Sequence, residues 1–215
     1  MAENTTKRSK RSREATETRE DILDVATREF ADKGLAGARI DEIAEKTSSS
    51  KRMIYYYFGG KDELYRAVLE KAYARIRAQE QDAHFENLPP AEALRAIIGN
   101  NFDYHFAHPE FVRLVMNENV HHGEHIAQIA SMKERNRSVI DALATILKKG
   151  EEQGVFRAGI DPVDLHSMIS SLSFYNVSNR HTFQHNFGVD FADPAVGAKR
   201  REQTIDCILA WVSAR

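Results

Sequence analysis

The sequence predicts an all-α protein of about nine helices. Three observations indicate this class. Apolar residues recur at spacings of three and four, several glycines and prolines lie where such stretches end, and strand-like alternation of any length is absent from the sequence. The chain has 215 residues, of which 42% are hydrophobic and 29% charged, so it can bury a sizeable core. A single cysteine, Cys207, a polar amino-terminus and short apolar runs predict a cytoplasmic protein without a membrane partner.

The first three predicted helices are short and closely spaced. A helix over residues 18–33 is indicated by apolar residues on one face, and Gly34 is placed to end it in the left-handed conformation. A second helix begins near Ile40 and is interrupted by the serines at 48–50. Ser50 is a good N-cap for a third helix, which Gly59 and Gly60 end.

The remainder of the chain predicts six further helices separated by proline and glycine. Asp161 and Pro162 form a cap and first turn for one of them. The predicted helices run from Lys61 to about Asn87, over 91–107, over 110–117, from after Gly123 to about Gln153, from Pro162 through Phe174, and over 194–214.

The charge is distributed unevenly. The formal net charge is −2, but residues 1–13 carry five basic side chains and one acidic side chain. We expect residues 1–17 to form a disordered basic arm that contacts phosphates. The alternative is a solubilising tail that has no partner.

The first three helices have the lengths and the tight turn of a helix-turn-helix. The third would then be the recognition helix, with its amino-terminal end in the major groove of DNA. Ser50, Lys51 and Arg52 supply polar donors at that end, and Arg52 is the candidate base reader because arginine can contact guanine with two hydrogen bonds.

Three more residues are candidate phosphate contacts. Tyr55 and Tyr56 lie one turn further along the third helix, and Lys61 marks the start of the next. The alternative interpretation is that all these residues form helix caps and a solvated basic face. Spacing alone leaves both interpretations open.

The stretch from Ile40 to Leu64, IDEIAEKTSSSKRMIYYYFGGKDEL, closely resembles the signature of the TetR family. The preceding helix, which ends in Phe30-Ala31-Asp32-Lys33-Gly34, and the overall length also resemble that family, and the match covers about residues 18–70. Residues 136–179 are similar to members described as RutR-like. The resemblance implies a bacterial homodimeric repressor with a DNA-binding domain over 18–63 and a ligand-binding and dimerisation domain over 64–215.

The resemblance also implies roles for individual residues. Ser50, Lys51, Arg52, Tyr55 and Tyr56 match the recognition-helix positions that touch DNA, and Lys61 matches a phosphate-contacting lysine. The sequence departs from the family pattern at three positions. Ser48 replaces a turn glycine, Ser49 replaces an apolar residue, and Arg39 stands where a Ser or Thr cap is common. We include Ser49 and Arg39 among the expected DNA contacts.

A ligand-binding core would need polar groups among apolar helix faces. Such residues follow the breaks at Pro90, Pro109 and Pro162, and they suit a planar effector with an anionic group, with no cofactor. The candidates are Asn101, Tyr104, His105, Phe111, Met116, Phe174, Tyr175, Asn179 and Arg180. The alternative is that they are ordinary core aromatics, interface polar groups and buried histidines.

The last two long helices are expected to form the dimer surface. Their apolar stripes exceed what one neighbouring helix needs, and pairing them with a second copy would give an isologous four-helix interface. A two-fold dimer would read a palindromic operator. The stripes are Met168, Leu172 and Tyr175 in one helix and Ile205, Ile208, Leu209 and Val212 in the other.

Two other classes of function remain as alternatives. His121, His122 and His125 lie in an H-x-x-E-H pattern that is typical of zinc peptidases, with Glu124 as the base, although Gly123 interrupts the helix this would need. We expect no metal and no enzyme activity. The second alternative, a constitutive architectural DNA-binding protein, is disfavoured by the acidic remainder of the chain.

Overall fold

A computed structural model describes residues 2–47, 49–82 and 85–214. These residues form ten α-helices and two short 3₁₀ helices, with no strand among them beyond an isolated bridge between Phe156 and Ser213. The predicted all-α class is therefore confirmed. The chain divides into two compact units. The amino-terminal unit comprises Met1–Ala72 and Arg113–Ala130, and the carboxy-terminal unit comprises Tyr73–Val112 and Ser131–Arg215.

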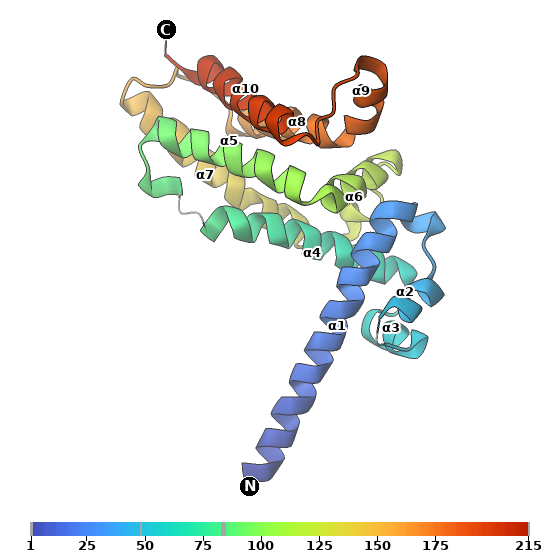
Figure 1. Cartoon of the computed structure of the whole chain (residues 1–215). Helices are drawn as coiled ribbons and strands as arrows, with labels where there is room; N and C mark the ends of the chain where they lie inside the picture. Colours follow the sequence, from blue (N-terminus) through green and yellow to red (C-terminus); the bar gives the residue numbers. More distant parts are fainter. Residues whose placement is uncertain (1, 48, 83–84, 215) are drawn as a thin grey trace. The chain divides into compact units, whose positions relative to one another are not determined.

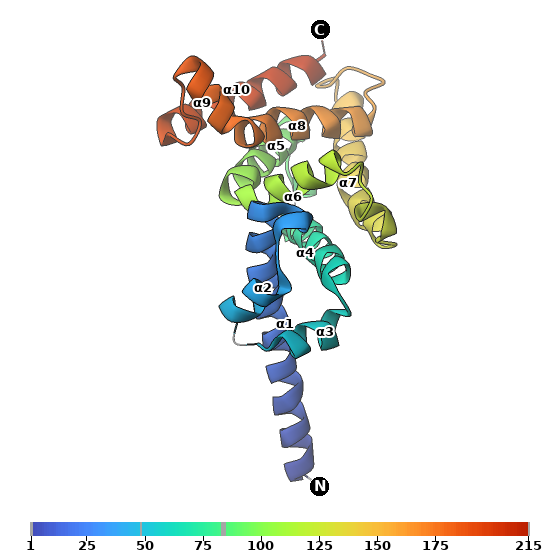
Figure 2. The ribbon, with the colours of Figure 1, turned by 90° about the vertical axis from the view of Figure 1, so that its right-hand side faces the viewer.

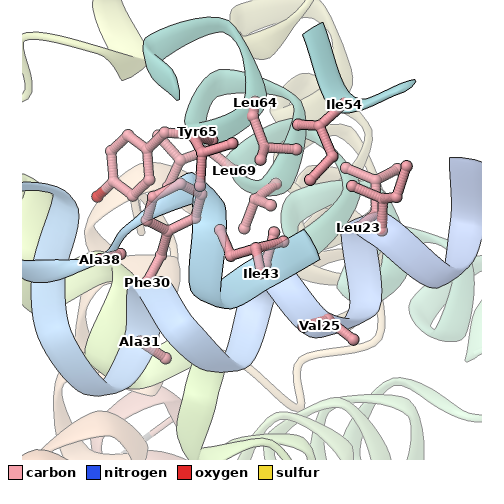
Figure 3. Close-up of a cluster of buried hydrophobic side chains, with 14 of the residues drawn as sticks. Leu23, Val25, Phe30, Ala31, Ala38, Ile43, Ile54, Leu64, Tyr65 and Leu69 are labelled. Carbon is pink, nitrogen blue, oxygen red and sulfur yellow. The ribbon is translucent and has the colours of Figure 1, made fainter. Parts of the chain in front are cut away.

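The amino-terminal unit is built around one apolar cluster. Its elements are α1 (Ala2–Gly37), α2 (Ile40–Lys46), α3 (Lys51–Phe58), the first part of α4 (Lys61–Asp82), the end of α6 (Pro109–Val120) and η2 (Ile126–Gln128) (Figure 1). The ring of Phe30 on α1 lies edge-on to that of Tyr65 on α4, with ring centroids 5.1 Å apart (Figure 3). Buried side chains from each of these α-helices thus hold α1, α2 and α3 together.

Helix α1 begins earlier than the sequence predicts. Residues 2–17, which we expected to be disordered, form the first turns of α1. This segment contains no proline or glycine and is rich in good helix formers. Arg13 and Glu17, one turn apart, also form an ion pair at 2.9 Å. The helix is interrupted at Gly34, whose φ of 67° and ψ of 175° are open essentially to glycine alone and differ from the left-handed helical conformation expected there.

A buried carboxylate joins α1 to α2. Glu29 is 6% exposed and accepts hydrogen bonds from Lys33, at 2.8 Å, and from Lys46 on α2. Lys33 also pairs with Glu42 on α2. The hydrogen bonds from Lys33 and Lys46 lower the pKa of Glu29 below 4.5, more than burial raises it. The ionised form of Glu29 therefore stabilises the packing of α1 against α2.

We expect Glu29→Gln to weaken this packing by about 2 kcal/mol at pH 7, because it removes charge-assisted hydrogen bonds. A carboxyl whose pKa is lowered by folding contributes stability above its unfolded pKa, and that contribution is lost as the pH falls through the folded pKa. The wild-type advantage should therefore shrink below about pH 4.5. The difference in stability between wild type and Glu29→Gln is measured by hydrogen exchange of the α1 and α2 amides at pH 7 and at pH 3. The exposed Glu45→Gln is the matched control, and equal protection in both variants would contradict the prediction.

The carboxy-terminal unit packs around α5 (Pro90–Ala107). The other elements are the end of α4, η1 (Phe85–Asn87), α7 (Met132–Glu152), α8 (Pro162–Ser178), α9 (Arg180–Phe187) and α10 (Pro194–Val212). Helix α5 lies against α7, α8 and α10, and α8 and α10 lie side by side (Figures 1 and 2). Asp161 caps α8 and Asp193 caps α10 by accepting main-chain N–H groups, as predicted for Asp161.

Three features of the helices differ from the sequence prediction. Helix α7 begins at Met132 rather than just after Gly123, because the Ile126 N–H donates to Glu118 instead of to a helical carbonyl. Helix α9 was not predicted, so the described chain has ten α-helices rather than nine. Residues 113–130 pack with the amino-terminal unit, which the expected boundary after residue 63 does not anticipate.

Candidate DNA-binding interface and apolar cavity

Helix α3 has one buried side chain and a polar, exposed opposite face. Ile54 is buried beside Leu64 of α4 (Figure 3). Arg52 is exposed and has no hydrogen bond or ion pair with any described residue. Tyr55 and Tyr56 are 46% and 78% exposed. Because helix geometry fixes which residues face inward, burial of Ile54 turns the guanidinium and both phenols outward.

The amino-terminal end of α3 is held in a defined position. Ser50 is the N-cap, and its hydroxyl accepts the Met53 N–H at 3.3 Å, as predicted. Lys51 forms an ion pair with Asp41 on α2, with Nζ 2.8 Å from Oδ1. The hydrogen bond between them raises the pKa of Lys51 and lowers that of Asp41. Lys51 is therefore a charged group at the start of α3. Ser48 lies outside the described residues.

The other predicted DNA contacts, Lys61, Arg39 and Ser49, lie outside α3 and differ in exposure. Lys61 is half-buried, and its Nζ donates to the carbonyl oxygen of Ala36 at 3.4 Å, which leaves further protons for a phosphate. Arg39 is exposed at the N-cap position of α2 and makes no side-chain capping bond. The Ser49 hydroxyl oxygen is buried and has no hydrogen-bond partner among the described residues. The Ser49 side chain thus does not join the exposed face.

Helix α1 contacts α3 near its middle and α6 nearer its carboxy-terminal end. The Arg19 guanidinium lies over the Phe58 ring at 5.2 Å, at the end of α3. On α6, Asn117 Nδ2 donates to the Phe30 carbonyl at 3.2 Å, and Arg113 pairs with Asp32. The end of α6 is therefore part of the framework that positions α1, and through α1 also α3.

The H-x-x-E-H segment does not have the geometry of a zinc peptidase. Residues 121–125 form turns after α6, and His122 has a positive φ of 57°, so His121 and His125 do not share a helical face. The Nδ1 atom of His125 lies 3.2 Å from Oε1 of the buried Glu118, and its ring lies edge-on to Tyr65. The peptidase alternative is wrong. No group of three or more metal-binding side chains occurs in the described part of the chain.

A cavity of about 200 Å³, partly open to solvent at the exposed Ala142, lies within the carboxy-terminal unit. Its wall is mostly apolar, and its two polar side chains are Glu80 of α4 and Ser138 of α7. The lining residues are Glu80, Phe85, Ile97, Ser138, Val139, Ala142 and Ile146. None of the predicted ligand residues is in this lining. The sequence signal was weak because Glu80 lies one helical turn after Arg77, a spacing that is also typical of surface ion pairs.

The predicted ligand residues separate into three groups. Tyr104, His105, Phe111 and Phe174 form a ring cluster, with centroids 5.7 to 5.9 Å apart between neighbouring α5, α6 and α8 rings. His105 is buried there, and its Nδ1 donates to the carbonyl of Asn101 at 2.7 Å, one turn earlier on α5.

The second and third groups lie elsewhere. Met116 is exposed and belongs to the amino-terminal unit. Tyr175 is exposed on α8, whereas Asn179 and Arg180 are half-buried at the junction of α8 and α9. The ring cluster thus brings together only part of the predicted set.

A second hollow, of about 190 Å³, lies between α8 and α10. Leu172 and Tyr175 line it and are 37% and 48% exposed. We expected Ile205, Ile208 and Val212 of α10 to form part of the dimer surface. They are instead buried in the core of the single chain. The exposed apolar face is therefore carried by α8. Trp211 is half-buried under the Arg157 guanidinium, 4.1 Å from its ring centroid.

A capped recognition-type helix on a small three-helix framework, joined to a helical unit with a cavity, defines the class of helix-turn-helix DNA-binding regulators. Residues 22–68 match the family model described as bacterial regulatory proteins, tetR family. Residues 90–208 match the model described as tetracyclin repressor-like, C-terminal domain. The protein belongs to the TetR family of bacterial transcriptional regulators, whose members are DNA-binding proteins and not enzymes.

Individual relatives agree with this assignment. The HTH-type transcriptional repressor NicS of Pseudomonas putida is 36% identical over 189 residues, which cover 88% of this chain and 89% of that protein. The HTH-type transcriptional repressor SCO4008 of Streptomyces coelicolor is 34% identical and covers 78% and 81% of the two chains. A crystal structure of the putative transcriptional regulator SCO4942 from Streptomyces coelicolor aligns with a TM-score of 0.69 at 26% identity, over 91% of this chain and 98% of that chain.

No helix among the described residues is both long enough and apolar enough to span a membrane.

Proposed function

We propose that this protein is a homodimeric repressor that binds a palindromic operator and is released from it by a small molecule bound in the carboxy-terminal unit. The observation that carries the DNA-binding part is the α3 face, where Arg52, Tyr55 and Tyr56 are exposed on a helix fixed by buried Ile54. Dimerisation and ligand response are typical of the TetR family. A repressor that acts on bacterial duplex DNA would work in the cytoplasm.

The proposed dimer uses the exposed face of α8 and the neighbouring part of α10. Leu172 and Tyr175 are exposed apolar side chains beside a hollow, and a second copy of the same face would cover both. A two-fold axis there would present two α3 helices to successive major grooves, about 34 Å apart along the DNA. This arrangement predicts an operator with two inverted half-sites.

The proposed coupling between ligand and DNA runs through α4. This helix starts at Lys61 in the amino-terminal unit and carries Glu80, on the cavity wall, in the carboxy-terminal unit. A ligand that favours one position of α4 would change the separation of the two α3 helices. For a typical effect the ligand must bind one state more tightly by about 1 to 3 kcal/mol.

The direct test is selection of bound duplexes from a random DNA library by the ligand-free protein at near-physiological salt. We expect a palindromic motif with two half-sites. A non-palindromic motif would contradict the dimer, and binding without any sequence enrichment would favour the architectural alternative. The selected duplex then serves as the probe for small molecules that release the protein.

The basic amino-terminal turns of α1 are proposed to contact phosphates beyond the recognition helix. We expect replacement of Lys7, Arg8, Lys10, Arg11 and Arg13 by glutamine to lower affinity for operator and random DNA alike. The slope of log affinity against log salt should become shallower by about 0.9 for each phosphate that the protein no longer neutralises. Fluorescence anisotropy at several salt concentrations measures the slope. An unchanged slope would identify the segment as a solubilising tail.

A further inference from the structure

The two basic residues at the start of α3 have different surroundings. Arg52 is exposed and has no ion pair with any described residue, so its guanidinium is available to DNA. Lys51, its neighbour in the chain, is held by Asp41 of α2, with Nζ 2.8 Å from Oδ1. Arg52 can therefore follow a phosphate or a base as the DNA approaches, whereas Lys51 is restrained from the side of α2.

Asp41 joins the starts of two helices. It lies in the first turn of α2, and its carboxylate contacts the first residue of α3. A lysine at that position is unfavourable in an isolated helix, because the amino-terminal end of a helix carries a partial positive charge, and Asp41 offsets this repulsion. The hydrogen bond from Lys51, together with the nearby charges of Lys51 and Arg39, lowers the pKa of Asp41. A negative charge is thus fixed beside the DNA-facing end of α3.

The ion pair is not needed to hold the two helices together. The side chains of Lys51 and Asp41 are 53% and 50% exposed, and ion pairs in such positions contribute little to stability. The packing of α3 with α2 depends instead on Ile43 and Ile54, which are buried in one apolar cluster. Either member of the pair can therefore be replaced without unfolding the domain, and its effect should appear in DNA binding.

The pair affects binding to random DNA through the phosphates. Each lysine or arginine that neutralises a phosphate raises the affinity by releasing a counterion. A phosphate that took up the Lys51 ammonium would compete with Asp41 for it, and it would lie well within the screening length of about 8 Å from that carboxylate. The attraction of the ammonium and the repulsion of the carboxylate then largely cancel. Lys51 should thus add little affinity for random DNA.

A restrained lysine is better suited to a base edge. Asp41 occupies one of the three donors of the Lys51 ammonium, which leaves two for acceptors in the major groove. Lysine can donate to O6 and N7 of guanine, and an ammonium that is already held in place loses less entropy when it makes this contact. The restraint therefore costs little on an operator, where α3 is seated in one register.

We propose that Asp41 is a positioning residue that determines specificity: it holds Lys51 so that the lysine contacts a base edge of the operator and adds no phosphate contact on random DNA. Asp41 thereby increases the ratio of operator affinity to random-DNA affinity, chiefly by lowering the second. The inference rests on the proposed function in that α3 enters the major groove. It does not depend on the effector or on the dimer face.

The test is fluorescence anisotropy of the full-length protein with a random-sequence duplex and with the selected operator, at several salt concentrations. In Asp41→Asn the released Lys51 should gain a phosphate on random DNA. Affinity for random DNA should then rise by about 3- to 10-fold at about 0.1 M salt, and the slope of log affinity against log salt should steepen by about 0.9. Operator affinity should change less, so the specificity ratio should fall.

Three further variants separate the ion pair from the net charge. Glu45→Gln removes the same charge from an exposed position of α2 and should keep the wild-type slope and ratio. Asp41→Glu retains the charge and can still reach Lys51, so it should also behave as wild type. The double variant Asp41→Asn with Lys51→Gln has the wild-type net charge. It should bind random DNA as wild type does, but bind the operator about 5- to 150-fold more weakly because the base contact is lost.

Three outcomes would overturn the inference. They are an unchanged affinity of Asp41→Asn for random DNA, an equal gain in Glu45→Gln, and a double variant that binds random DNA more weakly than wild type with a shallower slope. The last would show that Lys51 already contacts a phosphate in the wild-type protein. Each can occur while the wild type prefers its operator, so the proposed function would stand. A wild type that binds no duplex would contradict the proposed function, and the inference with it.

Discussion

Replacing Leu172 and Tyr175 together with glutamate should convert the protein to a monomer and lower its operator affinity by about 10²- to 10⁴-fold. Both side chains are exposed on α8 of the single chain, so the substitutions should cost the fold little. In the proposed dimer, four carboxylates would be placed in one apolar interface, where unpaired charges are strongly unfavourable. Each monomer would then hold one half-site without the gain from simultaneous binding of the second.

Analytical ultracentrifugation measures the oligomeric state, and anisotropy with the selected duplex measures the affinity. Val120→Glu, at an exposed apolar position of α6 in the amino-terminal unit, is the matched control and should remain dimeric. A dimer that persists in the double variant would show that the proposed face is incorrect. A monomer with undiminished operator affinity would instead show that dimerisation is not needed for binding.

Arg52→Ala should reduce operator affinity by about 1 to 3 kcal/mol, which corresponds to about 5- to 150-fold. The guanidinium is exposed at the start of α3 and is not engaged by any described residue, so its hydrogen-bonding capacity remains available for a base edge. The loss should be confined to the operator and to one base position in each half-site. Affinity for random DNA should change only by the effect of one charge.

Competition binding with operator variants at each position measures this specificity. Lys61→Ala should weaken operator and random DNA by a similar factor, because an amine that contacts a phosphate carries no sequence information. Arg137→Ala, an exposed arginine on α7 in the other unit, controls for the change in net charge. Equal losses on operator and random DNA in Arg52→Ala would exclude Arg52 as a base reader.

Local patterns in the sequence determined the helix-turn-helix. The cap at Ser50, the end of α3 at Gly59, the inward position of Ile54 and the outward position of Arg52 depend on the period of a helix and on its first and last turns. The start of α7 is different, because the Ile126 N–H is taken by a side chain from α6. Residues that suit a helix adopt another conformation when a distant group satisfies their backbone.

The cavity of the carboxy-terminal unit depends on tertiary structure. Arg77 and Glu80 are three residues apart on α4, and their sequence spacing is that of an ordinary exposed pair. Packing of α5, η1 and α7 around them removes water, raises the pKa of Glu80 and creates an apolar space in front of its carboxyl group. Similarly, Ile205 and Ile208 are buried, so the apolar stripe of α10 belongs to the core of the single chain and is not available to a partner. The sequence by itself thus determined the class of protein and the helix-turn-helix with its capped, outward-facing α3, because these follow from interactions between residues close in the chain. The charge state of a buried group and the face left for a partner depend on contacts between residues far apart in the chain, which only the folded structure specifies.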